Sequence, residues 1–212
     1  MTGQLLSEAS GLEVSVDTLR RLEMFCDLVR KWNPRINLVA KASIEDIWVR
    51  HIVDSAQLYR FAPQVSPLWA DLGSGGGFPG VILAVLSRQA APDRRHVLIE
   101  SDQRKAVFLR EAARALDCRI MVVSDRIEHV DVVSADVVTA RALAPLPQLL
   151  GLVARHLKPD GTAILPKGAA YDEELASARA NWCFDVNIHD SVTGAGGHIL
   201  QISGLRARIE GQ

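Results

Sequence analysis

The pattern of apolar and polar positions divides the chain near residue 66. Before that point apolar side chains recur every three or four positions, as they do on the buried face of a helix. One such stripe runs from Leu19 to Trp32, and Ser15 stands before it as a candidate N-cap. Pro34, preceded by Asn33, interrupts the stripe, so the first helix is expected to end there.

A second helical segment follows this break. Ser43 and Asp46, three residues apart, form a capping-box pattern that predicts its start. The predicted helix carries Ile47, His51, Asp54 and Leu58. Residues 1–62 are therefore expected to form a helical extension ahead of the first strand.

From residue 66 onward, short apolar runs alternate with segments of helical composition. The expected strands cover 68–72, 96–99, 119–123, 136–139 and 162–165, and the expected helices cover 80–88, 104–116 and 146–157. This alternation predicts a parallel sheet covered by helices on both faces, which is a doubly wound α/β fold. Residues 1–212 then form a single domain, whose α/β core covers 66–212.

The end of the chain shows a different pattern. A helix is expected at 172–181, and two strands at 183–192 and 199–202 flank a turn at 194–197. Two strands joined by a glycine-containing turn form a hairpin. The mostly parallel sheet is therefore expected to close with an antiparallel hairpin.

Composition narrows the class of protein. Hydrophobic residues make up 48% of the 212, enough for one substantial core. No apolar run reaches the roughly 18 to 20 residues of a membrane helix, and no signal-peptide pattern is present. Lysines and arginines number 24 against 25 acidic residues, so any surface for nucleic acid must be local. Three dispersed cysteines indicate neither disulfides nor a zinc site. We expect a cytoplasmic monomer without a metal or membrane contact.

The strand expected at 68–72 runs directly into a glycine cluster, Asp71-Leu-Gly-Ser-Gly-Gly-Gly-Phe-Pro-Gly80. Glycines let the backbone approach a ligand, and the following helix offers free N–H groups. The spacing Gly75-x-Gly77-x-x-Gly80 also matches a dinucleotide-binding loop. However, the carboxylate of Asp71 would repel a pyrophosphate and attract the positive charges of S-adenosylmethionine, so the loop favours the methyl donor.

The same loop resembles the signature of the ribosomal RNA small subunit methyltransferase G family. Further motifs follow in that family's order along most of the chain: Lys31-Trp-Asn33, Trp48-Val-Arg50-His51, Glu100-Ser101, Arg126-Ile-Glu128, Arg141-Ala142, Lys167-Gly168 and His198. The resemblance implies a class I S-adenosylmethionine-dependent methyltransferase fold, preceded by N-terminal helices. It also implies methyl transfer to N7 of a guanine in the decoding-region loop of 16S rRNA, within a small-subunit particle or its precursor.

The resemblance assigns donor-binding residues one position at a time. They are Gly73 and Phe78 in the glycine loop, Ile127 and Glu128 after the third strand, and Arg141 after the fourth. Asp71 and Gly75 join this set from the loop chemistry described above. Glu100 is a further candidate, because a carboxylate at a strand's carboxyl end can accept hydrogen bonds from both ribose hydroxyls. The alternatives are a surface role for Glu100 and a local ion pair between Glu128 and Arg126.

Substrate contacts are expected from basic groups. Arg141 can donate either to guanine O6 or to the carboxylate of the donor, and Lys167 can meet phosphate or the guanine carbonyl, or lie in solvent. Arg50 and His51 belong to a basic group in the N-terminal helices. That group also contains Lys31, Arg35 and Lys41, with Trp32 and Trp48 interleaved, and either faces RNA or combines core aromatics with solvated charges. His198 is expected to pack.

The expected chemistry needs no general base. Guanine N7 already carries an in-plane lone pair, so no residue is assigned a certain catalytic role, and Arg141 and Lys167 are positioning candidates. The segment after the fourth strand, Thr139-Ala-Arg-Ala-Leu-Ala-Pro145, lacks the Asn/Asp-Pro-Pro-aromatic motif of amine methylation. Two rivals remain: a nucleotide-dependent oxidoreductase, which lacks a Tyr-x-x-x-Lys pair here, and a noncatalytic RNA-binding assembly factor.

Overall fold

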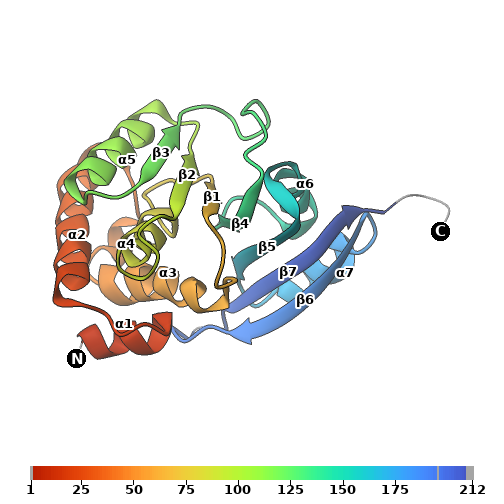
Figure 1. The fold of residues 1–212 in the computed structure, drawn as a ribbon, viewed down its shortest axis with the longest axis horizontal. Helices are drawn as coiled ribbons and strands as arrows, with labels where there is room; N and C mark the ends of the chain where they lie inside the picture. The colour runs from red at the N-terminus through yellow and green to blue at the C-terminus, as the bar shows by residue number, and fades with distance from the viewer. Residues whose placement is uncertain (1, 195, 209–212) are drawn as a thin grey trace.

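The computed structural model describes residues 2–194 and 196–208. Its strands are β1 (Leu68–Leu72), β2 (Arg95–Ile99), β3 (Ile120–Val123), β4 (Ala135–Ala140), β5 (Leu157–Lys167), β6 (Trp182–Asp190) and β7 (His198–Ala207). They form one sheet in the order β3-β2-β1-β4-β5-β7-β6 (Figure 1). The first five strands are parallel, and β7 runs antiparallel between β5 and β6. The predicted mostly parallel sheet with a closing antiparallel hairpin is confirmed.

Helices cover the sheet in two layers. The α-helices are α1 (Thr2–Ser10), α2 (Val16–Ile36), α3 (Asp54–Ala56), α4 (Gly80–Ala90), α5 (Gln103–Ala115), α6 (Leu146–His156) and α7 (Tyr171–Ala178). Side chains alternate between the two faces of β2: Leu98 packs in a core with α2, α4 and α5, whereas Val97 and Ile99 pack in the core of α6 and α7. No helix of the described chain is long and apolar enough to cross a membrane.

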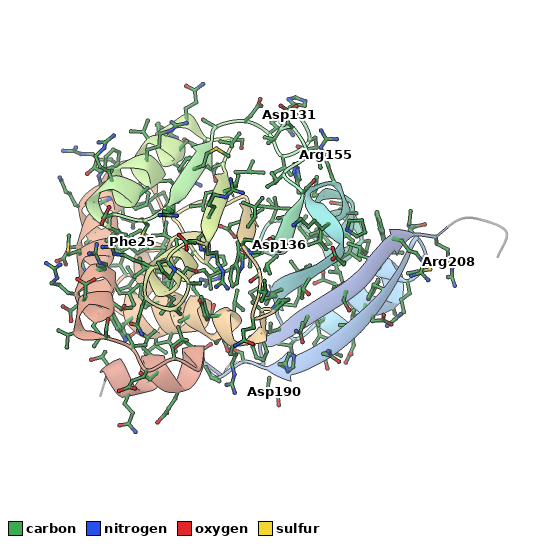
Figure 2. The ribbon with its side chains drawn as sticks, viewed as in Figure 1. Phe25, Asp131, Asp136, Arg155, Asp190 and Arg208 are labelled. Atoms are coloured by element: carbon green, nitrogen blue, oxygen red, sulfur yellow. The ribbon has the colours of Figure 1, made fainter. Side chains whose placement is uncertain are left out.

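Most expected elements lie within two or three residues of their predicted bounds, and β1 matches fully. The largest differences are at β5, which begins at Leu157 rather than residue 162, and at β7, which ends at Ala207 rather than residue 202. The first residues of β5 include Lys158 and Asp160, whose polar side chains interrupt the apolar run from which a strand is predicted. Asp190 and Arg208 lie at opposite ends of the β6–β7 hairpin, which projects from the rest of the fold (Figure 2).

The prediction of the second N-terminal helix is wrong in where the helix begins and in its helical type. Ser43 ends a short 3-10 turn (η1, Lys41–Ser43), and its hydroxyl donates to Ala40 O at 2.8 Å rather than capping a helix. A π-helix (η2, Trp48–Val53) then leads into α3 and a 3-10 segment (η3, Gln57–Phe61). The apolar spacing still predicted helical structure here, because 3-10, α and π helices all place every third to fifth residue on one side.

The helix before it is longer than predicted. Ser15 caps α2 as expected, accepting from Thr18 N at 3.2 Å, but the helix passes Pro34 and ends at Ile36. Pro34 removes only one amide, and the carbonyl of Arg30 that loses its partner lies on an exposed turn where water can bond it. Asn37 then takes a left-handed conformation with φ 47° and stops the helix.

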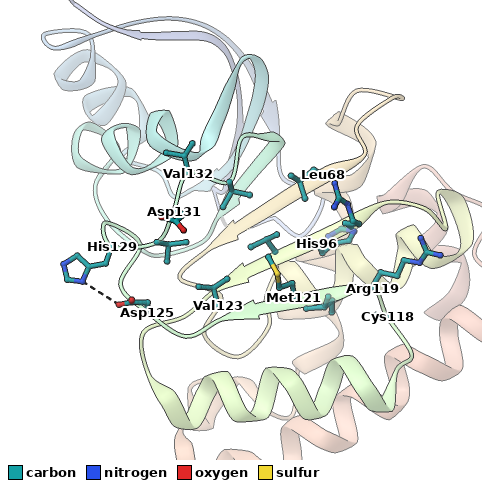
Figure 3. Close-up of a pocket in the computed structure, with 15 residues that line it drawn as sticks. Leu68, His96, Cys118, Arg119, Met121, Val123, Asp125, His129, Asp131 and Val132 are labelled. Carbon is teal, nitrogen blue, oxygen red and sulfur yellow. Dashed lines mark ion pairs between the residues drawn. The ribbon is translucent and has the colours of Figure 1, made fainter.

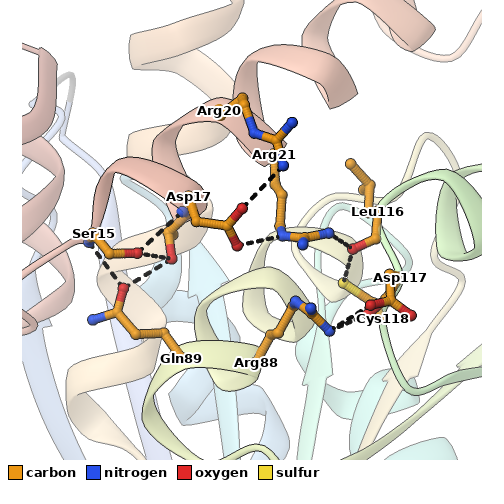
Figure 4. Close-up of polar contacts among 10 residues, drawn as sticks. Ser15, Asp17, Arg20, Arg21, Arg88, Gln89, Leu116, Asp117 and Cys118 are labelled. Carbon is orange, nitrogen blue, oxygen red and sulfur yellow. Dashed lines mark hydrogen bonds and ion pairs between the residues drawn. The ribbon is translucent and has the colours of Figure 1, made fainter.

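Polar contacts fix α2 against the ends of two core helices (Figure 4). Gln89 at the end of α4 accepts from Ser15 N at 2.9 Å and from the Thr18 hydroxyl at 2.8 Å. Arg21 donates to Leu116 O, which follows α5. On the buried side Phe25 packs against Phe78 and Phe108 with ring centroids 5.3 Å and 6.1 Å apart. The extension therefore packs directly against the α/β core.

The expectation that helices cover both faces fails at one edge. Residues 124–134 connect β3 to β4 through turns without a helix, so the face of β2 and β3 on the α6 side stays open. A groove of about 840 Å³ lies there between the strands and that connection (Figure 3). Met121 on β3 is 59% exposed in consequence.

The cap of α2 provides a test of how the extension is held. Replacing Ser15 with alanine removes the acceptor for Thr18 N, so Ser15→Ala should lower the free energy of unfolding by about 1 kcal/mol. Urea unfolding followed by circular dichroism measures the change. Ser203→Ala, at an exposed serine on β7, is the matched control and should stay near zero. Equal stability of the two variants would contradict the capping role.

Candidate functional site: two adjoining clefts

A first cleft of about 610 Å³ opens at the carboxyl ends of β1, β2 and β3. It brings together five of the predicted donor residues: Gly73, Gly75, Glu100, Ile127 and Glu128. Ile127 is buried, whereas Glu128 and Arg126 are exposed at the rim and form no ion pair with each other among the described residues. The local ion-pair alternative for Glu128 is therefore wrong.

The glycine loop forms one wall of this cleft. Two of its glycines lie so close to neighbouring residues that no larger side chain fits at their positions. Gly73 has a φ of +67°, and an added Cβ would lie 2.6 Å from Leu143 Cδ1. An added Cβ at Gly76 would lie 2.7 Å from Leu38 O, a backbone atom of the N-terminal extension. The loop therefore exposes bare backbone on one side and supports the extension on the other.

Glu100 holds the loop in place. Its Oε2 accepts from Gly75 N at 2.7 Å, and its Oε1 accepts from Asp102 N at 2.8 Å. The side chain is only 7% exposed, so the surface alternative for Glu100 is wrong. Each carboxylate oxygen retains a second lone pair, which leaves acceptors free within the cleft.

Asp71 and Phe78, which were also predicted to bind the methyl donor, lie behind the wall of the cleft and do not line it. Asp71 is 3% exposed; its Oδ1 accepts from the Thr139 hydroxyl at 2.7 Å, and its Oδ2 faces Gly80 without a hydrogen-bond partner among the described residues. Burial raises the pKa of Asp71 to about 6. Phe78 packs between Phe25 and His51. Contact of either side chain with a bound donor stays a prediction.

A second cleft of about 570 Å³ adjoins the first and shares Leu143 and Ala144 with it. It contains Arg141, which lines only this one of the two clefts. Arg141 Nη2 donates to Arg50 O at 3.1 Å and lies 3.5 Å from Asp54 Oδ2. These contacts tie the guanidinium to the N-terminal extension.

Lys167 forms a partly buried ion pair in the second cleft. Its Nζ donates to Ala144 O at 3.0 Å and lies 2.8 Å from Glu174 Oε2, and its side chain is 9% exposed. The solvated alternative for Lys167 is therefore wrong, and no local pattern had singled out Glu174 on α7. Burial acts to raise the pKa of Glu174, but the bonds from Lys167 and from Leu146 N outweigh it and leave that pKa below its ordinary value. The pair braces the wall shared by the two clefts.

The predicted basic group of the extension divides into surface and core. Its four cationic side chains, Lys31, Arg35, Lys41 and Arg50, are exposed. Trp32 instead packs edge-on against Phe108 and donates to Glu111 at 3.2 Å, so this aromatic belongs to the core.

His51 is also part of the packed wall. Its Nε2 lies 2.9 Å from the Ser43 hydroxyl, and its ring packs 5.0 Å from that of Phe78. Burial, and then the charges of Arg141 and Arg50, lower the pKa of His51 to about 4. The imidazole is therefore neutral near pH 7 and offers no positive charge to RNA.

Other chemistry finds little support in the described part of the chain. No group of three His, Cys, Asp or Glu side chains is placed to hold a metal ion there. Burial raises the pKa of the Cys26 and Cys118 thiols to about 11, which keeps both protonated. His198, expected only to pack, packs against Tyr171 with ring centroids 4.1 Å apart and ring planes tilted by 39°, and it also lines the second cleft.

Comparison with known proteins identifies the family. The model of the family described as rRNA small subunit methyltransferase G matches residues 18–203. The chain belongs to that family. It is 50% identical over 201 residues to the ribosomal RNA small subunit methyltransferase G of Ruegeria pomeroyi, covering 95% of this chain and 98% of the relative. It is 48% identical over 205 residues to the protein of that name from Cereibacter sphaeroides, covering 97% and 99%.

Solved structures agree on the fold. An O-methyltransferase from Bacillus cereus in complex with SAH superposes with a TM-score of 0.55 at 12% identity, covering 95% of this chain and 96% of that one. The O-methyltransferase TomG from Streptomyces achromogenes in complex with SAM gives 0.54 at 13% identity, covering 86% and 89%. The fold is that of class I S-adenosylmethionine-dependent methyltransferases, as the methyltransferase G family requires, and the oxidoreductase alternative is set aside.

The neutral His51 predicts a pH dependence of stability. Its folded pKa of about 4 lies below the ordinary value of 6.5, so the folded state binds fewer protons between those values than the unfolded state. His51 therefore lowers the free energy of unfolding as pH falls from about 6.5 to about 4. His51→Gln should flatten the pH dependence in this window, measured by urea unfolding. His129→Gln, at an exposed histidine, should keep the original slope; an unchanged slope in His51→Gln would contradict the assignment.

Proposed function

We propose that this protein transfers a methyl group from S-adenosylmethionine to N7 of a guanine in the decoding-region loop of 16S rRNA. The observation that carries the proposal is the pair of adjoining clefts, one under the glycine loop and one beside Arg141, which meet at Leu143 and Ala144. A methyl donor bound in the first cleft and an acceptor base bound in the second would be neighbours where the two clefts meet. Membership of the methyltransferase G family supports this assignment.

The residues that line the first cleft suit the binding of S-adenosylmethionine. Glu100 offers acceptors for the ribose hydroxyls, and the bare backbone at Gly73 and Gly75 leaves room for the amino-acid part of the donor. Ile127 supplies an apolar surface for the adenine, beside Glu128 at the rim. When bound, the donor supplies an electrophilic methyl group on a sulfonium.

The second cleft would position the base without acid–base chemistry. Guanine N7 attacks through an existing lone pair, so the protein has only to hold it in line with the methyl group. Such alignment can lower a barrier by about 7 to 11 kcal/mol in favourable cases. Arg141 lines the cleft with a guanidinium suited to guanine O6, while Lys167, already paired with Glu174, holds the wall in place.

The RNA-facing surface follows from the exposed cations. Lys31, Arg35, Lys41 and Arg50 lie on the extension, and Arg50 is joined through its carbonyl to Arg141 in the second cleft. Because the net charge of the chain is only −1, a structured small-subunit particle or precursor is a better substrate than free RNA. The protein would act as a monomer in the cytoplasm, where ribosomes assemble.

Methyl transfer is the direct test. Small subunits from a strain that lacks this protein should accept tritium from labelled S-adenosylmethionine, and the label should be recovered as 7-methylguanine. Arg141→Ala should lower kcat/KM by about 10- to 100-fold, the worth of a hydrogen bond from a charged donor. Arg155→Ala, which removes an arginine on α6 bonded to Val130 O, is the control. Donor binding without any transfer would favour the noncatalytic assembly factor.

The donor site can be tested separately. Glu100→Gln keeps the size of the side chain but replaces one acceptor with an amide donor, which would oppose either Gly75 N or Asp102 N. Its affinity for S-adenosylmethionine should fall at least about tenfold by calorimetry. Glu173→Gln, at an exposed glutamate on α7, should bind as the unsubstituted protein does. Unchanged affinity in Glu100→Gln would contradict the placement of the donor.

A further inference from the structure

Asp54 places a carboxylate in the second cleft that no motif had singled out as a ligand. It begins α3 and its side chain is 18% exposed. Its two oxygens differ in their surroundings. Oδ1 accepts from Gln57 Nε2 at 3.0 Å and from the Thr193 hydroxyl at 2.9 Å, whereas the one polar contact of Oδ2 among the described residues is Arg141 Nη2 at 3.5 Å.

Hydrogen bonds from Gln57 and Thr193 fix the orientation of the Asp54 carboxylate. Gln57 is 1% exposed, and its Oε1 accepts from Val192 N at 2.9 Å, so its amide group cannot rotate freely. The contacts of Gln57 and Thr193 hold Oδ1 of Asp54 toward the loop after β6. Oδ2 is the oxygen left with capacity to accept from a ligand.

Glu174 is the other carboxylate among the described residues that line this cleft, and it is already paired within the protein. Glu174 Oε2 is already bonded to both Lys167 Nζ and Leu146 N, at 2.8 Å and 2.6 Å. Asp54 and Arg141 therefore offer the cleft one anionic acceptor beside one cationic donor. This is a chemical pattern that a nucleobase edge can match.

Guanine carries the matching pattern on its Watson–Crick edge. Its O6 acceptor stands next to the N1–H and N2–H₂ donors, whereas adenine presents a donor next to an unprotonated N1 that a carboxylate would repel. Enzymes that act on a base commonly take it out of the stack and bind this edge. Contacts there also leave N7, on the opposite side of O6, unobstructed.

We infer that Asp54 is the residue that specifies guanine in this cleft: its Oδ2 accepts from N1–H and N2–H₂ while Arg141 donates to O6. The inference rests on the proposed function and adds the basis of its base selectivity. A site built around such bonds discriminates strongly against a base that lacks one partner, because a buried polar group is then left unpaired.

The experiment compares guanine with inosine, which lacks only the N2 amino group. Small subunits are reconstituted with 16S rRNA that carries guanine or inosine at the methylated position, and kcat/KM is measured with labelled S-adenosylmethionine. The unsubstituted protein should prefer guanine by at least about tenfold. In Asp54→Asn, kcat/KM on guanine should fall at least about tenfold, and the preference over inosine should shrink to within about twofold. Asp160→Asn, at an exposed aspartate on β5, should retain the full preference.

The outcomes separate this inference from the proposed function. Absence of transfer to guanine by the unsubstituted protein would overturn both. Transfer with equal rates on guanine and inosine would overturn the inference alone, and this arm needs no variant that must fold. Equal losses on both bases in Asp54→Asn would also overturn it, because a purely structural aspartate would act in that way. Binding of S-adenosylhomocysteine within about twofold of the original affinity shows that the variant keeps its fold.

Discussion

The parallel pairing of β1 with β4 at the centre of the sheet is the constraint on which both clefts depend. The chain leaves β1 toward α4 on one face and leaves β4 toward α6 on the other, so the two connections diverge and open a crevice. The bond from the Thr139 hydroxyl to Asp71 joins the two strands directly beneath it. The glycine loop and the segment containing Arg141 are the two sides of this opening.

The charged groups around the crevice are largely balanced within the protein. Lys167 is paired with Glu174, Arg141 lies beside Asp54, and Glu100 accepts from two backbone amides. Such pairs add little net stability, because desolvation offsets their attraction, but they hold polar atoms in defined directions. The proposed reaction, which would depend on alignment rather than proton transfer, would benefit from that arrangement.

The N-terminal extension connects the exposed cationic side chains to the glycine loop. Leu38 O packs so closely on Gly76 that no side chain fits between them, and Phe25 packs against Phe78. His51 lies on the other side of Phe78, close to the charge of Arg141. A disturbance of the extension would therefore reach both clefts through packed contacts.

The strands, their alternation with helices and the glycine loop could all be predicted from the amino-acid sequence. Apolar periodicity and turn residues report burial and backbone conformation over a few neighbouring positions, and both properties are local. The strand-end position of Glu100 made it a candidate for ligand binding, because the carboxyl ends of parallel strands meet at one edge of a sheet, whereas Arg141 became a candidate through the family resemblance. The π-helical form of 48–53 was not predicted from the sequence, since helical coils of different pitch share a similar apolar spacing.

Only the tertiary structure decided which polar side chains meet. Thr193 approaches Asp54 from 139 positions away, and the open groove beside Met121 exists because the β3–β4 connection forms no helix. Asp71, whose charge suggested contact with the donor, is buried behind the loop by the packing of α4. These contacts depend on how the sheet and its helices are arranged in space, and no pattern of neighbouring residues encodes that arrangement.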